Sequence, residues 1–289
     1  MTVDSSPADE PSVADALRQA CQQGLPRLEA QMLLLHALQR SPHERAWLVS
    51  HDQEPVATPT LLQYQALVHA RLQGSPIAYL TGGREFYGLE LHITPDVLDP
   101  RPDTEILVDW ALELLAGKPA PRVLDLGTGS GAMALAIQHA CPHAQVVAVE
   151  RSPAALQVAR TNAARHALPV RFLQGSWLQA LEDAGEPGQF AVIVANPPYI
   201  ADNDVHLAAL QHEPRTALVA GDDGLQDLRT IIKQAAFWLQ PNGWLLLEHG
   251  WQQHDAVRTM LADAGYAQID FRRDLAGHVR CTGACRPRA

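Results

Sequence analysis

Short apolar segments alternate with segments of helical periodicity from residue 102 to the end of the chain. The expected strands are residues 122–126, 144–150, 170–173, 190–195, 244–248 and 267–271, and the expected helices are 102–115, 132–140 and 153–166. Apolar strands separated by helices form a mostly parallel sheet that is covered on both faces. We therefore predict an α/β domain over residues 99–289, with a doubly wound sheet whose ligands bind where the strand order reverses.

Residues 12–75 are expected to form a small helical bundle. The helix starts are signalled by Ser12, by Pro26, by the capping-box pattern from Ser41 to Glu44, and by Thr58 before Pro59. Gly24 and Gly74 are suitable stop residues. The segment carries no chemical motif, so its expected role is recognition of a substrate protein or packing.

A β-hairpin linker is predicted between these two parts, over residues 76–98. Residues 77–80 and 89–93 have the composition of β segments, and they flank Gly82, Gly83 and Gly88. Residues 1–11 are acidic and small, which predicts a disordered tail without the features of a signal peptide.

The charge balance bears on the possible partners. The chain of 289 residues has 22 Lys and Arg against 32 Asp and Glu, a formal charge of -10. Such a surface repels a phosphate backbone unless a local basic patch overrides the average, so we expect no stable nucleic-acid partner. Charges or prolines interrupt every long apolar run, which argues against a membrane partner.

The cysteines and histidines do not form a metal-ligand pattern. The four cysteines are scattered and include no CxxC pair, as expected for a reduced, cytoplasmic protein. Cys281 and Cys285 alone make at most half of a metal site, and the 13 histidines lack metal-ligand spacing on a single element. We therefore assign no metal.

A glycine-rich loop follows the first expected strand of the α/β domain. The loop residues, which we expect to contact a cofactor, are Gly127, Thr128, Gly129, Ser130 and Gly131. Glycines there allow a tight turn and the close approach of a ligand. Glu150 lies about twenty residues further on, at the next strand end, where a carboxylate can bind two ribose hydroxyls.

Two cofactors fit this pattern, because Gly127, Gly129 and Ala132 also satisfy the looser fingerprint of a dinucleotide site. Asp125, just before the loop, would oppose a pyrophosphate but suits a ligand with an ammonium group. S-adenosylmethionine carries an ammonium and a sulfonium and has no phosphate, so we favour it. Trp177, just after the third strand, is expected to stack on its adenine.

The proposed chemical site follows the strand 190–195. Asn196, Pro197, Pro198 and Tyr199 form a rigid turn, because two consecutive prolines fix φ and remove two backbone donors. The Asn196 side-chain oxygen and the Pro197 carbonyl could each accept one hydrogen of an NH2 group, and Tyr199 could stack on the planar group behind it. We predict methylation of a planar nitrogen by orientation, without a dedicated general base.

These motifs resemble the HemK/PrmC family, the glutamine methyltransferases of peptide chain release factors. The further segments that carry the resemblance are residues 74–82, 84–86, 100–105, 212–214, 217–218 and 247–250. The resemblance implies that the substrate is the glutamine of the Gly-Gly-Gln motif in class 1 release factors. It also implies that the glycine loop, Glu150, Trp177 and Asn196 contact the cofactor, and that residues 196–199 hold the glutamine.

The chain departs from the family pattern at Asp99, where we expect an apolar residue, and only loosely follows it over residues 277–281. We assign no role to Glu213 and Glu248. The alternative functions are an adenine-N6 methyltransferase acting on DNA or RNA, a glutamine methyltransferase of a ribosomal protein, and a cofactor-binding scaffold that docks on another protein.

Overall fold

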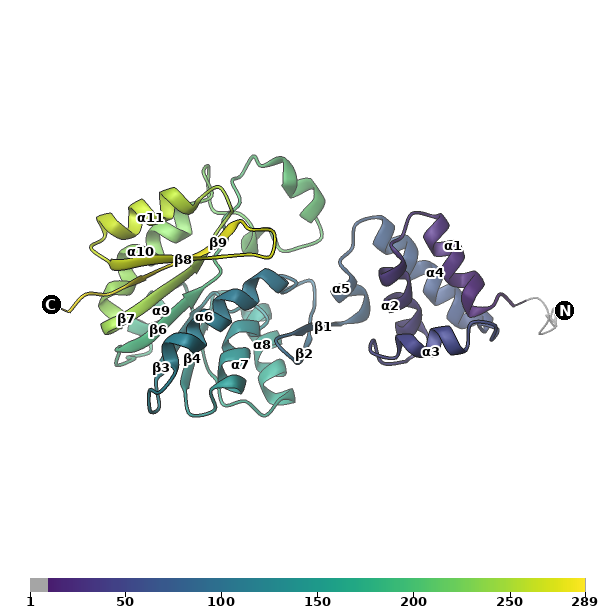
Figure 1. Ribbon diagram of the computed structural model, residues 1–289, viewed down its shortest axis with the longest axis horizontal. Coiled ribbons are helices and arrows are strands. Elements are labelled where there is room, and N and C mark those ends of the chain that lie inside the picture. Colours follow the sequence, from purple (N-terminus) through teal and green to yellow (C-terminus); the bar gives the residue numbers. More distant parts are fainter. Residues whose placement is uncertain (1–9, 289) are drawn as a thin grey trace. The chain divides into compact units, whose positions relative to one another are not determined.

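The computed structural model describes residues 10–288, which divide into two compact units between Gly82 and Gly83 (Figure 1). Residues 1–9 of the predicted tail lie outside the described residues. Glu10 and Pro11, which we assigned to that tail, are hydrogen-bonded: a Glu10 carboxylate oxygen accepts from the backbone N–H of Thr58 at 3.0 Å, and the Pro11 carbonyl accepts from that of Val56 at 2.9 Å. Glu10 and Pro11 are therefore part of the folded helical unit, ahead of its first helix.

The first unit is helical, as predicted. Its helices are α1 (Val13–Gln22), α2 (Arg27–Ala37), α3 (Arg45–Ser50), α4 (Thr58–Leu72) and α5 (Ile77–Thr81). Ser12 and Asp15 form a reciprocal capping box at the start of α1. Leu33, Leu34 and Leu35 are fully buried, so α2 lies at the centre of this small core.

The prediction of a strand at residues 77–80 is wrong, because this segment is helix α5. Pro76 precedes it with an extended conformation, and Gly82 ends it in the left-handed region at a φ of 74°. Ile77 and Leu80 pack against the core of the bundle, and this packing overrides their β propensity.

The hairpin itself is present but begins later, pairing β1 (Gly83–Phe86) with β2 (Leu89–His92). It is fastened to helix α8 (Pro153–Arg165) through Asn162. The Asn162 side-chain oxygen accepts from the His92 N–H at 2.7 Å, and its amide group donates to the His92 carbonyl at 3.0 Å. The hairpin is therefore part of the second unit.

The second unit contains the predicted doubly wound sheet. Its strands are β3 (Arg122–Leu126), β4 (Gln145–Glu150), β5 (Arg171–Gln174), β6 (Phe190–Ala195), β7 (Leu239–Glu248), β8 (Ala267–Arg273) and β9 (Val279–Cys285). The spatial order is β5-β4-β3-β6-β7-β9-β8. Strands β3 to β7 are parallel, and β9 is antiparallel to both of its neighbours.

Helices cover both faces of this sheet (Figure 1). One layer contains α6 (Glu105–Leu115), α7 (Ala132–Ala140) and α8, and the other contains α9 (Gln179–Asp183), α10 (Gln226–Trp238) and α11 (His254–Asp263). Short 3-10 turns are η2 (Pro102–Thr104), η3 (Val205–Leu210) and η4 (Arg215–Ala217). Within residues 10–288, no helix combines the length and apolarity needed to cross a membrane.

Candidate active site

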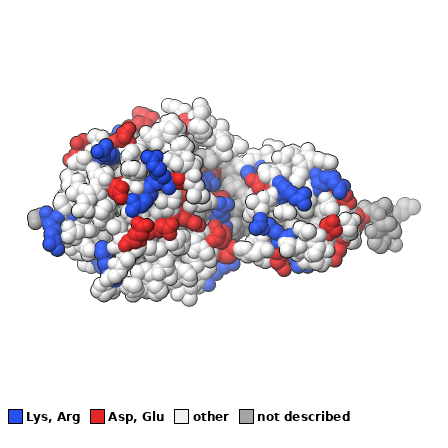
Figure 2. Space-filling model, in the orientation of Figure 1, with Lys and Arg blue, Asp and Glu red and all other residues white. Residues whose placement is uncertain are grey.

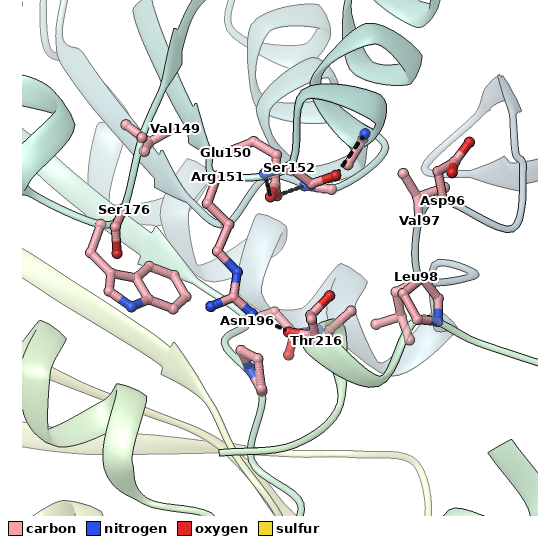
Figure 3. A pocket seen from close by; sticks show the side chains of 18 residues that line it. Asp96, Val97, Leu98, Val149, Glu150, Arg151, Ser152, Ser176, Asn196 and Thr216 are labelled. Atoms are coloured by element: carbon pink, nitrogen blue, oxygen red, sulfur yellow. Dashed lines mark hydrogen bonds between the residues drawn. The ribbon is translucent and has the colours of Figure 1, made fainter. Parts of the chain in front are cut away.

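The strand order reverses at β3, which lies between β4 and β6. A cavity opens at the carboxyl ends of these three strands, where the sequence predicted a ligand site (Figure 3). The predicted site residues that line it are Gly127, Gly129, Glu150, Trp177, Asn196 and Pro198. The structure therefore brings the glycine loop and the proline turn to one cavity.

The glycine loop has the geometry for which glycine is required. Gly127 has a φ of 73° and Gly131 a φ of 88°. A Cβ on Gly127 would lie 3.0 Å from Trp177 Cζ3, and one on Gly131 would lie 3.1 Å from Leu135 Cδ1. The loop is tied to the neighbouring strand, because the N–H groups of Gly127 and Thr128 both donate to the Val149 carbonyl, at 2.9 and 3.0 Å.

Asp125 is not among the residues that line the cavity, so its expected contact with an ammonium group stays a prediction. Its side chain is fully buried and accepts from the Thr128 hydroxyl at 2.6 Å and from the Ala134 N–H at 3.2 Å. Burial raises the pKa of Asp125 to about 7. Thr128 and Ser130 are also buried and lie outside the cavity lining, as does Gly131. Through these hydrogen bonds, Asp125 stabilises the glycine loop from the protein interior.

Glu150 faces the cavity from the end of β4. Its Oε2 accepts from the Gly129 N–H at 3.0 Å, and its Oε1 accepts from the Ser152 N–H at 2.9 Å. These bonds fix the orientation of the carboxylate, and each oxygen keeps a second lone pair. The group is therefore held ready to accept from a pair of hydroxyls.

Trp177 forms a wall of the same cavity. Its backbone has a φ of 44°, which is uncommon for a bulky residue. The indole N–H donates to Asp227 Oδ1 at 3.1 Å, and the far edge of the ring lies against Gly127. The hydrogen bond to Asp227 and the contact with Gly127 hold the indole ring in a fixed position, as stacking on a ligand requires.

The proline turn is split between the cavity and the protein interior. Asn196 and Pro198 line the cavity, and the Asn196 Nδ2 donates to Thr104 Oγ1 at 3.2 Å. Pro197 is buried, and Tyr199 packs against the core of the sheet. The Tyr199 hydroxyl donates to Glu248 Oε1 at 3.4 Å, and burial raises the pKa of this phenol. The ring of Tyr199 is thus absent from the cavity lining.

Several lining residues were not among the predicted site residues, because they come from segments outside the glycine loop and the proline turn. They include Asp96, Val97 and Leu98, which lie across the cavity from Ser176 (Figure 3), and Pro214, Thr216 and Ala217. Arg151 joins this second group to the end of β4, since its guanidinium donates to the Thr216 carbonyl at 2.9 Å.

The unexpected Asp99 belongs to a buried ionic cluster beside the cavity. Its carboxylate lies 3.7 Å from the guanidinium groups of both Arg84 and Arg101, and Arg101 also pairs with Glu213. Burial raises the pKa of Asp99, while the two arginines oppose that change. The charged residue is accommodated because cations replace the apolar packing that we expected.

Two domain families of known proteins match parts of this chain. Residues 103–221 match the methyltransferase small domain, and residues 12–82 match the PrmC N-terminal domain. A release factor glutamine methyltransferase of Bordetella pertussis is 51% identical over 264 residues, covering 90% of this chain and 95% of that protein. One of Burkholderia pseudomallei is 48% identical over 287 residues, covering 96% of this chain and 98% of that protein.

A solved structure of lower similarity has the same fold. The 16S rRNA N2 G1207 methyltransferase of T. thermophilus, in complex with AdoMet and guanosine, is 22% identical with a TM-score of 0.52, covering 71% of this chain and 50% of that one. The identity over nearly the full length of the bacterial relatives is decisive. The chain belongs to the release factor glutamine methyltransferase family.

Proposed function

We propose that this protein transfers a methyl group from S-adenosylmethionine to the side-chain amide nitrogen of the glutamine in the Gly-Gly-Gln motif of class 1 release factors. The observation that carries the proposal is that Asn196 and Pro198 share one cavity with Gly127, Glu150 and Trp177. The near full-length similarity to release factor glutamine methyltransferases supports the same substrate.

The residues of the cavity fit S-adenosylmethionine. Glu150 offers oriented acceptors for the two ribose hydroxyls, and the fixed indole of Trp177 offers a face for adenine. The close approach of Trp177 to Gly127 leaves no room for a Cβ at that position. When bound, the cofactor supplies an electrophilic methyl group on a sulfonium.

The protein's contribution to the reaction is orientation. The Asn196 side-chain oxygen and the Pro197 carbonyl are proposed to accept the two N–H groups of the glutamine amide. These bonds aim the nitrogen lone pair, which is otherwise delocalised into the carbonyl. Fixed geometry of this kind can lower a barrier by up to about 7–11 kcal/mol in favourable models.

No general base is assigned, because the ionisable residues in the lining, Asp96, Glu150 and Arg151, come from outside the proline turn. The proton is proposed to leave after the nitrogen has become cationic and acidic. Tyr199 is proposed to anchor the turn to the core, since its ring packs against the core of the sheet and its hydroxyl donates to Glu248.

The helical unit is proposed to recognise the protein substrate. Leu28, Val49 and Leu62 are 51, 69 and 61% exposed, so they offer apolar contacts on its surface. We expect their replacement by serine to raise the KM for a whole release factor. The kcat/KM for a short Gly-Gly-Gln peptide should stay unchanged, and an equal loss on both substrates would contradict this role.

The central experiment supplies methyl-labelled S-adenosylmethionine to the purified protein with a release factor, a ribosomal protein or an oligonucleotide. We expect label only in the release factor, located on the motif glutamine by mass analysis and absent when that glutamine is alanine. Figure 2 shows acidic side chains interspersed with basic ones on the visible face, so we expect no label in the oligonucleotide. Label there but not in the release factor would overturn the proposal.

A further inference from the structure

Glu248 is a buried carboxylate next to the proline turn, and the reaction as proposed above gives it no direct part. It ends strand β7, one residue beyond Leu247, which pairs with Ala195 in β6. Its side chain is 1% exposed, and among the described residues its Oε2 has no hydrogen-bond partner. Burying a carboxylate oxygen without a hydrogen bond costs folding free energy, so Glu248 is a candidate for a functional role.

Thr104 connects Glu248 to Asn196. It ends the short turn η2, is 5% exposed, and its hydroxyl is near enough to the Glu248 carboxylate to lower the pKa of that group. The same Oγ1 lies 3.2 Å from the Asn196 Nδ2. One buried hydroxyl thus lies between a carboxylate and the amide that we place in the active site.

The direction of these hydrogen bonds follows from the chemistry of the groups. An ionised carboxylate only accepts, and Glu248 Oε2 has no other partner among the described residues, so we assign the single proton of the Thr104 hydroxyl to a bond with Glu248. The Thr104 oxygen then has only lone pairs left, and it can bind only the NH2 end of Asn196. The carbonyl end of the Asn196 amide is consequently turned away from Thr104.

We infer that Thr104 and Glu248 are positioning residues, which hold the Asn196 amide in the one orientation that presents its oxygen to the substrate nitrogen. This inference rests on the proposed function and specifies how the acceptor of that site is fixed. With the reverse orientation, Asn196 would present an NH2 group to the NH2 of the substrate, and neither could accept.

The charge state of Glu248 controls this arrangement. The groups that face Glu248 are Tyr199 and Asp103, and from strand β9 Arg280 and Cys281. Burial raises the pKa of Glu248 to about 7, against the hydrogen bond from Thr104 and the charge of Arg280. A protonated Glu248 can donate to Thr104, which frees the threonine hydroxyl to donate to the Asn196 oxygen. Protonation therefore removes the preference for the productive orientation.

The test uses the full-length protein with Thr104→Val, Thr104→Ser and Glu248→Gln. We expect kcat for the release factor to fall on the order of tenfold to a hundredfold in the valine and glutamine variants, since misorientation at a reacting centre has costs of this size. The serine variant keeps the hydroxyl and should retain most of kcat. The dissociation constant of S-adenosylmethionine, measured by calorimetry, should stay near that of the wild type in all three.

Two readouts separate positioning from a general effect on folding. In nitrogen-15 NMR spectra of the protein, the side-chain NH2 signals of Asn196 should shift in Thr104→Val and return in Thr104→Ser. The acidic limb of the kcat profile near the pKa of Glu248 should disappear in Glu248→Gln. Glu186→Gln is the matched control, because Glu186 is a buried carboxylate that pairs with Arg122 and Arg171 away from the cavity.

The outcomes also distinguish the inference from the function on which it rests. If the wild type methylates no release factor, the proposed function fails. If the wild type is active and Thr104→Val keeps its kcat and the Asn196 signals, the positioning inference is wrong. Should Glu248→Gln not fold, the valine and serine pair decides the question alone.

Discussion

Replacing Gly127 by alanine is expected to weaken cofactor binding through Trp177. Gly127 has a φ of 73°, and its missing Cβ would lie 3.0 Å from Trp177 Cζ3 and 3.3 Å from Cη2. The indole cannot move freely, because its N–H donates to Asp227 and its own backbone has a φ of 44°. The added methyl therefore displaces the surface on which we expect adenine to stack.

Two contributions make up the expected effect. Alanine in the left-handed region costs about 1–2 kcal/mol of unfolding free energy. Tilting the indole away strains or breaks its hydrogen bond, which is worth roughly 0.5–1.5 kcal/mol. If the displaced indole lowers the binding free energy of S-adenosylmethionine by about 1–2 kcal/mol, the dissociation constant rises by a factor of about 5–30.

Gly117→Ala is the matched control for backbone strain. Gly117 has a φ of 72°, and no atom lies within 4 Å of the position of its Cβ. Chemical denaturation should show a loss of stability in both variants, smaller in Gly117→Ala because only backbone strain contributes there, whereas calorimetry should show weaker cofactor binding only in Gly127→Ala. Equal affinities in the two variants would refute the argument that the glycine is required by the indole.

Three further predictions test other parts of the site. Asn196→Ala should abolish most turnover on a release factor while calorimetry still detects cofactor binding, and unchanged turnover would remove its role as acceptor. Burial raises the pKa of Asp125 to about 7, so its contribution to stability is complete below its unfolded pKa near 3.8 and is lost as the pH rises through 7. Asp125→Asn should therefore flatten the fall in unfolding free energy across this pH range. Glu248, whose pKa is raised in the same direction, should still contribute to the remaining slope, and His249, whose pKa is lowered to about 4, should oppose it. An unaltered profile would contradict the assignment. Arg151→Ala removes the hydrogen bond to the Thr216 carbonyl. In stopped-flow measurements the cofactor should dissociate about three- to tenfold faster, which is within the range of one hydrogen bond. A dissociation rate equal to that of the wild type would rule out this expectation.

The sheet could be predicted because its strands are short, apolar and buried. Strands β3 and β6 were predicted with their observed bounds, since every residue of Phe190–Ala195 is buried and the flanking residues are turn formers. Helix α10 was missed, although Leu228, Ile231, Ile232 and Ala235 recur on one buried face at helical spacing. The signal for that helix was present in the sequence and could have been used.

Other features depend on tertiary contacts that no local pattern contains. Residues 77–80 have β propensity, and only their packing on the helical core makes them helix α5. The direction of a side chain is equally nonlocal: Asp125 and Tyr199 belong to the right motifs, yet both point into the interior. Residues 96–98, and Pro214, Thr216 and Ala217 at the short turn η4, reach the cavity from distant parts of the chain.

The proline turn by itself does not distinguish a glutamine from other substrates with an NH2 group. Substrate specificity must therefore arise elsewhere on the protein. Acceptors arranged for an NH2 group suit a carboxamide and an exocyclic amine of a base equally well. Selection must therefore come from surfaces that contact the rest of the substrate. The region matching the PrmC N-terminal domain, residues 12–82, is helical, and the whole chain carries a charge of -10. The negative charge opposes a polyphosphate partner, so we expect docking of a protein substrate to decide the choice before the amide is oriented.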